Sequence, residues 1–177
     1  MYKKNMSPSM YLNGKALKCI DVHKYLGIFI CSNNRDDRDI RRQIQATSGR
    51  GNVLINKFRN CYDNVKVQLF KTYCSNFYCC QLWASYSKSS YKKVPVAYNN
   101  VFRALFKLDR RCSVSQNFLN KNIDCFNILM RKAIYRFRSR LFQSENSLVK
   151  ACLSSQFFIY SSNIGCKWYE LLFKEHL

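Results

Sequence analysis

The chain has 177 residues, of which 47% are hydrophobic and 15% aromatic, so it carries enough apolar surface to fold and is not a disordered tail. Its 30 Lys and Arg residues against 10 Asp and Glu residues give a formal charge of +20, which favours a polyanionic partner. No apolar run approaches the roughly 18 residues that a membrane-spanning helix needs, so we expect no transmembrane segment.

The first part of the chain, residues 1–32, predicts a small antiparallel β element. Asn13-Gly14 separates two short runs, and both residues tolerate the positive φ that a tight hairpin turn requires. The aromatic and β-branched run 24–31 (KYLGIFIC) then predicts one buried strand. Because so few strands make a poor core, we expect this element to pack on something larger.

From Asn33 onward the hydrophobic spacing becomes helical, and residues 33–143 predict a helical bundle. The first helix should run from a cap at Asn33 or Asn34 to about residue 60. Its apolar face should consist of Ile40, Ile44, Thr47, Gly51, Leu54 and Phe58. A second helix should start at a cap, Asp63. Its stripe should consist of Val65, Leu69, Tyr73, Phe77 and Cys80, with Trp83 near its end.

A Ser- and Lys-rich break at 85–90 precedes a third predicted helix, in which Pro95 fits only in the first turn. Its stripe should consist of Val94, Tyr98, Val101, Leu105 and Leu108. After a loop at 110–113, Asp124 should cap a fourth helix. Its stripe should consist of Phe126, Met130, Ala133, Phe137 and Leu141. The C-terminal part, 144–177, should hold short helices near 148–153 and 167–173. The predicted fold class is therefore mainly α, with a small N-terminal β element followed by a helical bundle.

Cations and acids are separated along these predicted helices, because no acidic residue occurs within 40–62, 64–108 or 125–144. Unpaired cations on a helix repel each other unless an external polyanion neutralises them, and nucleic acid is the commonest such partner. The candidate phosphate contacts are Lys66, Lys71, Lys92, Lys93, Arg103, Arg110 and Arg111, followed by Arg41, Arg42 and Arg59. An acidic protein or an anionic membrane surface is the alternative partner. Most aromatic residues lie on the apolar stripes, which favours a role in the core.

No catalytic constellation is evident, and we expect neither a bound metal nor a cofactor. Asp36-Asp37 is the one adjacent carboxylate pair, but its flanking arginines and its place at a helix start favour dipole stabilisation on a solvated face. His23 is the only histidine expected inside the fold, and the ten cysteines include no CxxC pair of the kind that binds zinc. We interpret the cysteines as reduced core residues of an intracellular protein, in the nucleus or the cytoplasm.

Several short motifs follow one another between residues 10 and 113. They are Tyr11-Leu12-Asn13-Gly14, His23-Lys24-Tyr25-Leu26-Gly27-Ile28, Leu69-Phe70-Lys71-Thr72-Tyr73, Leu82-Trp83-x-x-Tyr86-x-x-Ser89, Val96-Ala97-Tyr98-Asn99-Asn100-Val101-Phe102-Arg103 and Arg110-Arg111-Cys112-Ser113. In their order and spacing, these motifs resemble the C-terminal part of a non-LTR (LINE-type) retrotransposon reverse transcriptase.

The resemblance implies a palm edge with a primer-grip-like strand at Lys24, Tyr25, Leu26 and Gly27, followed by a helical thumb. Such a module would contact an RNA or DNA template–primer duplex. The family's catalytic aspartates lie upstream of this strand motif, where the chain is too short to hold them, so we expect no catalytic residue. Mg²⁺ would serve only a complete polymerase of the family. We therefore expect a nucleic-acid-binding fragment of an RNA-directed DNA polymerase. The alternatives are a non-catalytic basic interaction protein and a functionless retroelement remnant.

Overall fold

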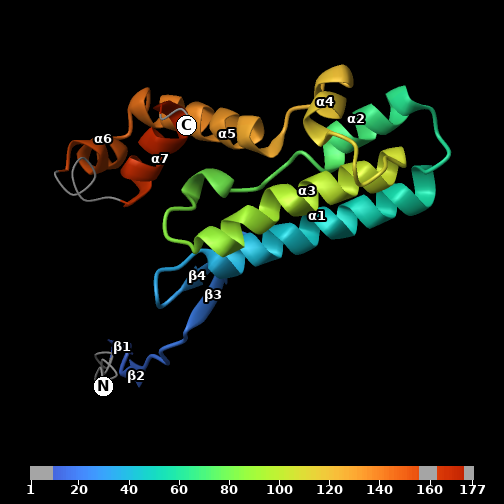
Figure 1. Cartoon of the computed structure of the whole chain (residues 1–177). Helices are drawn as coiled ribbons and strands as arrows, with labels where there is room; N and C mark the ends of the chain where they lie inside the picture. Colours follow the sequence, from blue (N-terminus) through green and yellow to red (C-terminus); the bar gives the residue numbers. More distant parts are fainter. Residues whose placement is uncertain (1–9, 156–162, 174–177) are drawn as a thin grey trace.

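The structure is a computed structural model, and it describes residues 10–155 and 163–173. Within these residues the protein is mainly helical, with two small antiparallel hairpins at its N-terminal end, which confirms the predicted fold class (Figure 1). The strands are β1 (Tyr11–Leu12), β2 (Lys15–Ala16), β3 (Val22–Tyr25) and β4 (Ile28–Cys31). The helices are α1 (Asp37–Phe58), α2 (Asp63–Tyr73), the 3₁₀ helix η1 (Cys80–Leu82), α3 (Lys88–Phe106), α4 (Val114–Asn120), α5 (Phe126–Phe142), α6 (Ser147–Ser154) and α7 (Asn163–Phe173).

The first hairpin forms where the sequence predicts it. Asn13 and Gly14 have φ values of 50° and 75°, and β1 pairs with β2 across them. The predicted single strand over 24–31 is wrong, because Leu26 and Gly27 also adopt positive φ, 45° and 84°, and reverse the chain between β3 and β4. The Leu26 side chain is 72% exposed. The primer-grip-like motif is thus the end of a strand and a turn.

Helices α1 and α3 lie side by side and run in the same direction, as Figure 1 shows. Their starts are joined by the Asp36 N–H, which donates to the Ser85 carbonyl at 2.7 Å. Further along, Gly51 of α1 faces Val101 of α3 so closely that a Cβ on Gly51 would lie 2.6 Å from the Val101 Cγ2 atom. The predicted apolar face of α1 is confirmed. Its fully buried members are Ile40, Thr47, Gly51 and Leu54.

The buried face of α2 differs from the predicted one. The helix ends at Tyr73 and buries Lys66 and Phe70, whereas Val65 and Tyr73 are 41% and 50% exposed. Phe77, which the prediction placed on the same stripe, lies beyond the end of α2. The predicted stripe was wrong because it was extended past the end of α2 to Phe77 and Cys80. This extension selected the wrong side of a short helix.

The core lies where α2, α3, α4 and α5 meet, and aromatic rings form its centre. Phe102 of α3 lies 5.4 Å from Phe70 of α2 and 4.4 Å from Phe118 of α4, between ring centroids. The buried Tyr98 hydroxyl donates to the Asp124 carbonyl at 2.9 Å, so its polar atom has a partner. From α5, Phe126 packs on Phe77 at 5.0 Å. The predicted inward face of α5 is therefore confirmed at Phe126.

Several local expectations are corrected. Pro95 lies beyond the first turn of α3, and α3 ends at Phe106 because Lys107 adopts a left-handed conformation. The N-cap positions of α1, α2 and α5 are Asp36, Tyr62 and Cys125, none of which makes a side-chain capping hydrogen bond, rather than the predicted Asn33 or Asn34, Asp63 and Asp124. Helices α4 and η1 were not predicted from the sequence.

The cysteines also differ from expectation, because only Cys74 and Cys80 are buried. No helix in the described part of the chain is both long and apolar enough to cross a membrane.

Candidate nucleic-acid interface

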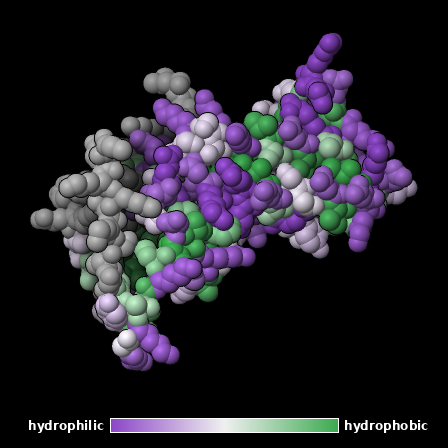
Figure 2. Space-filling model, turned by 90° about the horizontal axis from the view of Figure 1, so that it is seen from below, coloured by the Kyte–Doolittle hydropathy of each residue, from purple (hydrophilic) through white to green (hydrophobic). Residues whose placement is uncertain are grey.

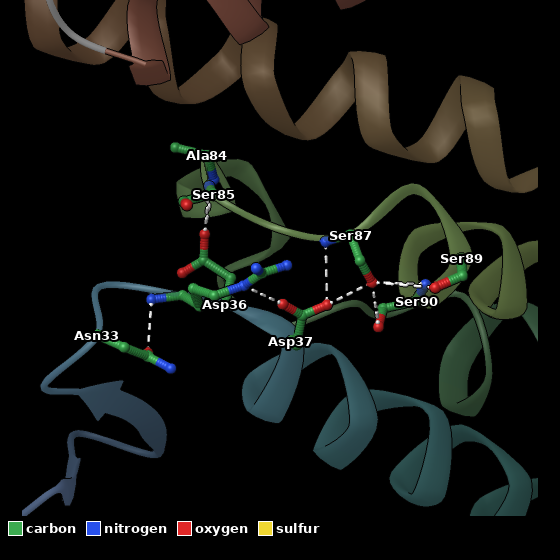
Figure 3. A network of polar contacts seen from close by, with 9 residues as sticks. Asn33, Asp36, Asp37, Ala84, Ser85, Ser87, Ser89 and Ser90 are labelled. Atoms are coloured by element: carbon green, nitrogen blue, oxygen red, sulfur yellow. Dashed lines mark hydrogen bonds and ion pairs between the residues drawn. The ribbon is translucent and has the colours of Figure 1, made fainter. Parts of the chain in front are cut away.

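The carboxylates at the start of α1 hold the segment that leads into α3 (Figure 3). One oxygen of Asp36 accepts hydrogen bonds from the Ala84 and Ser85 amides, both at 2.8 Å. Asp37 accepts from the Ser87 amide at 3.0 Å and the Ser87 hydroxyl at 2.7 Å. The predicted solvated face is therefore wrong, because both carboxylates serve as acceptors for a segment about fifty residues away.

The environment shifts the pKa values of these two carboxyls in opposite directions. Burial raises the pKa of Asp36, although the amide hydrogen bonds from Ser85 and Ala84 oppose this. Desolvation also raises the pKa of Asp37, but contacts with Ser90, Ser87 and Arg35 outweigh it and hold that pKa well below its usual range.

Asp39, which is buried, adds further contacts to those that Asp36 and Asp37 make with the segment before α3. Its carboxylate accepts from the Trp83 indole N–H at 3.0 Å, from the Phe29 amide at 3.2 Å and from Arg42 at 2.7 Å. Because Asp39 is 3% exposed, these donors compensate the cost of its burial. The three acidic residues thus fix the hairpin, α1 and the start of α3 relative to one another.

A hollow of about 880 Å³ opens between the second hairpin and the start of α1. Lys24 of β3 and Arg38 and Arg41 of α1 line it, and none of the three forms an ion pair within the described residues. Arg38 instead lies over the Phe29 ring, 5.0 Å from its centroid. Of the acids on the lining, Asp37 is paired with Arg35 at 2.8 Å. Five cations against two acids line the hollow, so it is a groove with excess positive charge.

A second hollow of about 390 Å³ lies between α1 and α3, and it continues the first along α1. Gln45 lines the first hollow and Ser48 the second, and three residues along a helix are neighbours on one face. We call the lining cations without an ion pair, together with the uncharged polar residues of α1 and α3, the polar track. It consists of Lys24, Arg38, Arg41, Gln45, Ser48, Asn52, Lys93 and Asn100. The first hollow is also lined by Asp21, Ser32, Asn33, Arg35, Asp37 and Arg42, and the second by apolar residues such as Ile55 and Val96.

The polar track has a length that suits a stretch of nucleic-acid backbone. Arg38 and Asn52 are fourteen residues apart on α1, which at about 1.5 Å per residue is about 21 Å. One strand of duplex DNA rises about 3.4 Å per nucleotide, so the track matches about six nucleotides. Figure 2 shows that hydrophilic side chains cover much of one face of the molecule, with smaller hydrophobic patches between them.

The structure brings Lys24, Arg41 and Lys93 of the sequence-predicted set onto the polar track. Arg42 reaches the same hollow, but its guanidinium is bound to Asp39. Lys66 is 7% exposed and faces Asp63 at 3.7 Å, so it is not available to a phosphate.

The other predicted cations lie elsewhere. Arg103 is half-buried, and its Nε has no hydrogen-bond partner within the described residues. Lys71 is half-buried on α2. The remaining cations are exposed away from the two hollows, and they are Arg59, Lys92, Arg110 and Arg111. The primer-grip-like residues Tyr25, Leu26 and Gly27 end β3 and form the turn before β4, and of that motif only Lys24 lines a hollow.

Sequence reasoning missed Arg38 and the uncharged members of the track. Arg38 is surrounded by acids in the sequence, so a search for acid-free stretches passes over it. Gln45, Ser48 and Asn52 recur at spacings of three and four on the polar side of a predicted helix, which is the signal that places them on one line with Arg41.

Nothing in the described residues gathers three or more His, Cys, Asp or Glu side chains in the way that a metal site requires. No protein family, curated protein or solved structure matches the chain at a significant level.

Proposed function

We propose that the chain binds the sugar–phosphate backbone of nucleic acid along the polar track and performs no catalysis there. The observation that carries this proposal is the continuous line of donors on α1, flanked by Lys24 and Lys93, whose cations have no ion-pair partner within the described residues. Arg and Lys with Asn, Gln and Ser side chains are the groups that contact phosphate and sugar oxygens in nucleic-acid complexes.

The chemistry of the track favours binding that is independent of base sequence. Its donors lie on a helix face flanked by a second helix and a hairpin, and Phe29, the aromatic ring at its edge, is covered by Arg38. Stacking of bases needs a free aromatic face, so the track supplies contacts to the backbone rather than base recognition. A duplex with its regular row of phosphates is the partner that this arrangement favours.

The resemblance to non-LTR reverse transcriptases leads to a more specific proposal for the same surface. In that reading the chain is the thumb region of a reverse-transcriptase-like protein, and the polar track contacts a template–primer duplex. The support is the order of the short motifs and the placement of Lys24, from the K-Y-L-G motif, beside Arg41 on the track. A polymerase of this kind would need catalytic aspartates and Mg²⁺ that this proposal does not assign to the chain.

The test is the salt dependence of binding to a labelled 20-base-pair DNA duplex and to an RNA–DNA hybrid, measured by fluorescence anisotropy between 50 and 200 mM salt. The triple variant Lys24→Gln, Arg38→Gln, Arg41→Gln should lower the slope of log K against log salt on duplex DNA by about 2.7, because each lost phosphate contact removes about 0.9. The control replaces three exposed cations outside the track, Lys18→Gln, Lys57→Gln and Lys88→Gln, with the same change in net charge.

The control variant should keep most of the slope, since it retains every track residue. Equal loss in the two triple variants would show that binding follows net charge alone and would refute a site at the polar track. Failure of the unmodified chain to bind either duplex at 50 mM salt would refute the proposal as a whole. Stronger binding to the hybrid than to DNA would support the reverse-transcriptase reading.

A further inference from the structure

Helix α5 has a second apolar stripe on the side opposite the core. Its inward face is buried through Phe126, Met130 and Ile134. On the other side, Ile128, Tyr135 and Phe142 are 42%, 64% and 57% exposed. These three outer residues are seven apart, which is two helical turns, so they align along one face. A helix with apolar residues on both sides has one face that the core does not cover.

Positive charge lies on both sides of this outer stripe. By helical position, Arg131 and Arg138 flank it on one side, and Lys132 and Arg136 flank it on the other. Helix α5 contains no acidic residue. Lys132 pairs with Asp124 at 2.6 Å, while Arg131 and Arg136 are exposed and form no ion pair within residues 10–155 and 163–173. We call the three apolar residues and these four cations the α5 outer face.

This pattern is that of a helix that pairs with another helix. In a coiled coil, two apolar positions per heptad form the seam, and charged residues beside the seam select the partner through opposite charge. The α5 outer face supplies one of the two apolar positions in each seven residues, and the aliphatic stems of its cations lie at the other. The cations of the α5 outer face therefore favour a partner with acidic flanking positions. A second copy of this chain would place cation against cation, which opposes self-association through this face.

We propose that the α5 outer face docks an acidic amphipathic helix of a partner protein, one that carries apolar residues at heptad spacing between Asp and Glu residues. Nucleic acid is the competing occupant, because the face is basic. However, a phosphate backbone gains nothing from Ile128 and Phe142, and the lining of the polar track contains no such row of large exposed apolar residues. The apolar stripe is the feature that favours a helix.

The α5 outer face is separate from the polar track. Figure 1 shows α5 on the side of α3 that faces away from α1, and no residue of α5 lines either hollow of the track. Loss of duplex binding and loss of helix docking are therefore expected from different substitutions, and the failure of one proposal leaves the other standing.

The probe is a synthetic 21-residue helical peptide with Leu at the two seam positions of each heptad and Glu at the positions beside the seam, labelled with fluorescein. A second peptide carries Lys in place of Glu. We expect the full chain to bind the Glu peptide and not the Lys peptide. Tyr135→Ser should weaken binding about tenfold or more, as expected for an aromatic residue at the centre of an interface. Tyr62→Ser is the matched control, because Tyr62 is 86% exposed on another helix end.

A charge exchange gives the sharper result. The double variant Arg131→Glu, Arg136→Glu should no longer bind the Glu peptide and should bind the Lys peptide instead. Lys18→Glu should change the affinity for neither peptide. All these side chains are exposed, so far-UV circular dichroism should be unchanged. The proposal is overturned if the Glu peptide does not bind, if Tyr135→Ser binds it as well as the unmodified chain does, or if the charge exchange does not reverse the preference. Loss of DNA duplex affinity in Tyr135→Ser, with no peptide binding, would assign the face to nucleic acid instead.

Discussion

Replacement of Gly51 by Ala should destabilise the protein, although alanine is the better helix former. In an exposed helix interior, Gly→Ala stabilises by about 1 kcal/mol, because glycine loses more backbone entropy on folding. At Gly51 the new Cβ would lie 2.6 Å from the Val101 Cγ2 atom and 3.0 Å from its Cβ atom, well inside ordinary contact distance. Val101 is 6% exposed and β-branched, so it has no free rotamer into which to move.

The size of the effect follows from these two opposing contributions. Overpacking of a well-filled contact costs about 1 to 3 kcal/mol, and a clash with two methyl groups of a stiff side chain belongs near the upper end of that range. After the gain of about 1 kcal/mol in helix propensity, the free energy of unfolding should fall by about 2 kcal/mol. For a chain of this length, that is a drop of roughly 4 to 8 °C in Tm.

The matched control is Gly49→Ala, two residues earlier on the same helix, where nothing lies within 4 Å of the added Cβ. Gly49→Ala should raise stability by up to about 1 kcal/mol in urea unfolding followed by circular dichroism at 222 nm. Val101→Ala in the Gly51→Ala background should restore room for the Cβ. Gly51→Ala costs about 2 kcal/mol with Val101 present and should gain about 1 kcal/mol without it, so the double-mutant cycle should show a coupling of about 3 kcal/mol. A Gly51→Ala variant as stable as Gly49→Ala would mean that α1 and α3 are farther apart at this point, and it would refute the reasoning.

Two further predictions concern charged residues with assigned partners. The pKa of Asp37 is lowered in the fold, so its ionised form stabilises the native state. This stability is complete above the ordinary value of 3.8 and is lost as the pH falls below about 4. Asp37→Asn should therefore flatten the acid side of the profile of urea midpoint against pH, and it should cost about 1.5 to 3 kcal/mol at pH 7, the usual contribution of hydrogen bonds to a charged group. An unchanged acid profile would contradict this. Lys66→Met should change stability by less than about 1 kcal/mol, because the 3.7 Å ion pair to Asp63 is long and Lys121 holds Asp63 at 2.6 Å. The affinity of Lys66→Met for the DNA duplex at 100 mM salt should equal that of the unmodified chain. A lower affinity would show that Lys66 contacts the duplex.

The helices that the sequence predicts well are those with a long, regular apolar face. The face of α1 repeats over six turns, and tolerates Thr47 and Gly51 within it, because the spacing is sustained. Helix α2 is half that length, and its buried face includes Lys66, which is 7% exposed and faces Asp63. A polarity pattern counts Lys66 as exposed and therefore selects the neighbouring side, of which only Leu69 packs against the core. The positive φ at Leu26 has no equally clear signal, because only Gly27 of that turn favours it by residue type.

The candidate interface was less predictable than the helices, for a reason that lies in the arrangement of α1 and α3. The search for acid-free stretches identified Arg41 and Lys93. That both line the same track depends on the packing of α1 against α3, and these two residues are about fifty positions apart in the chain. Neutral residues such as Gln45 and Asn52 carry no charge signal. Asn52 joins the track because α3 runs beside α1 there, whereas Gln45 joins it through the hollow between the second hairpin and α1.

The acidic residues that the sequence placed on a solvated helix start explain why this arrangement leaves positive charge at the surface. Asp36 and Asp37 bind the segment before α3, and Asp39 binds Trp83 and Arg42, so these carboxylates fix the two helices in parallel from their first turn. The same contacts occupy most of their acceptor atoms. No other acidic residue follows on α1, and Asp37, four residues before Arg41, is bound by Arg35 and Ser87, so Arg41 forms no ion pair within the described residues. The carboxylate contacts that align α1 with α3 therefore also leave the cations of the polar track without acidic partners. An external polyanion can reduce the repulsion between such cations.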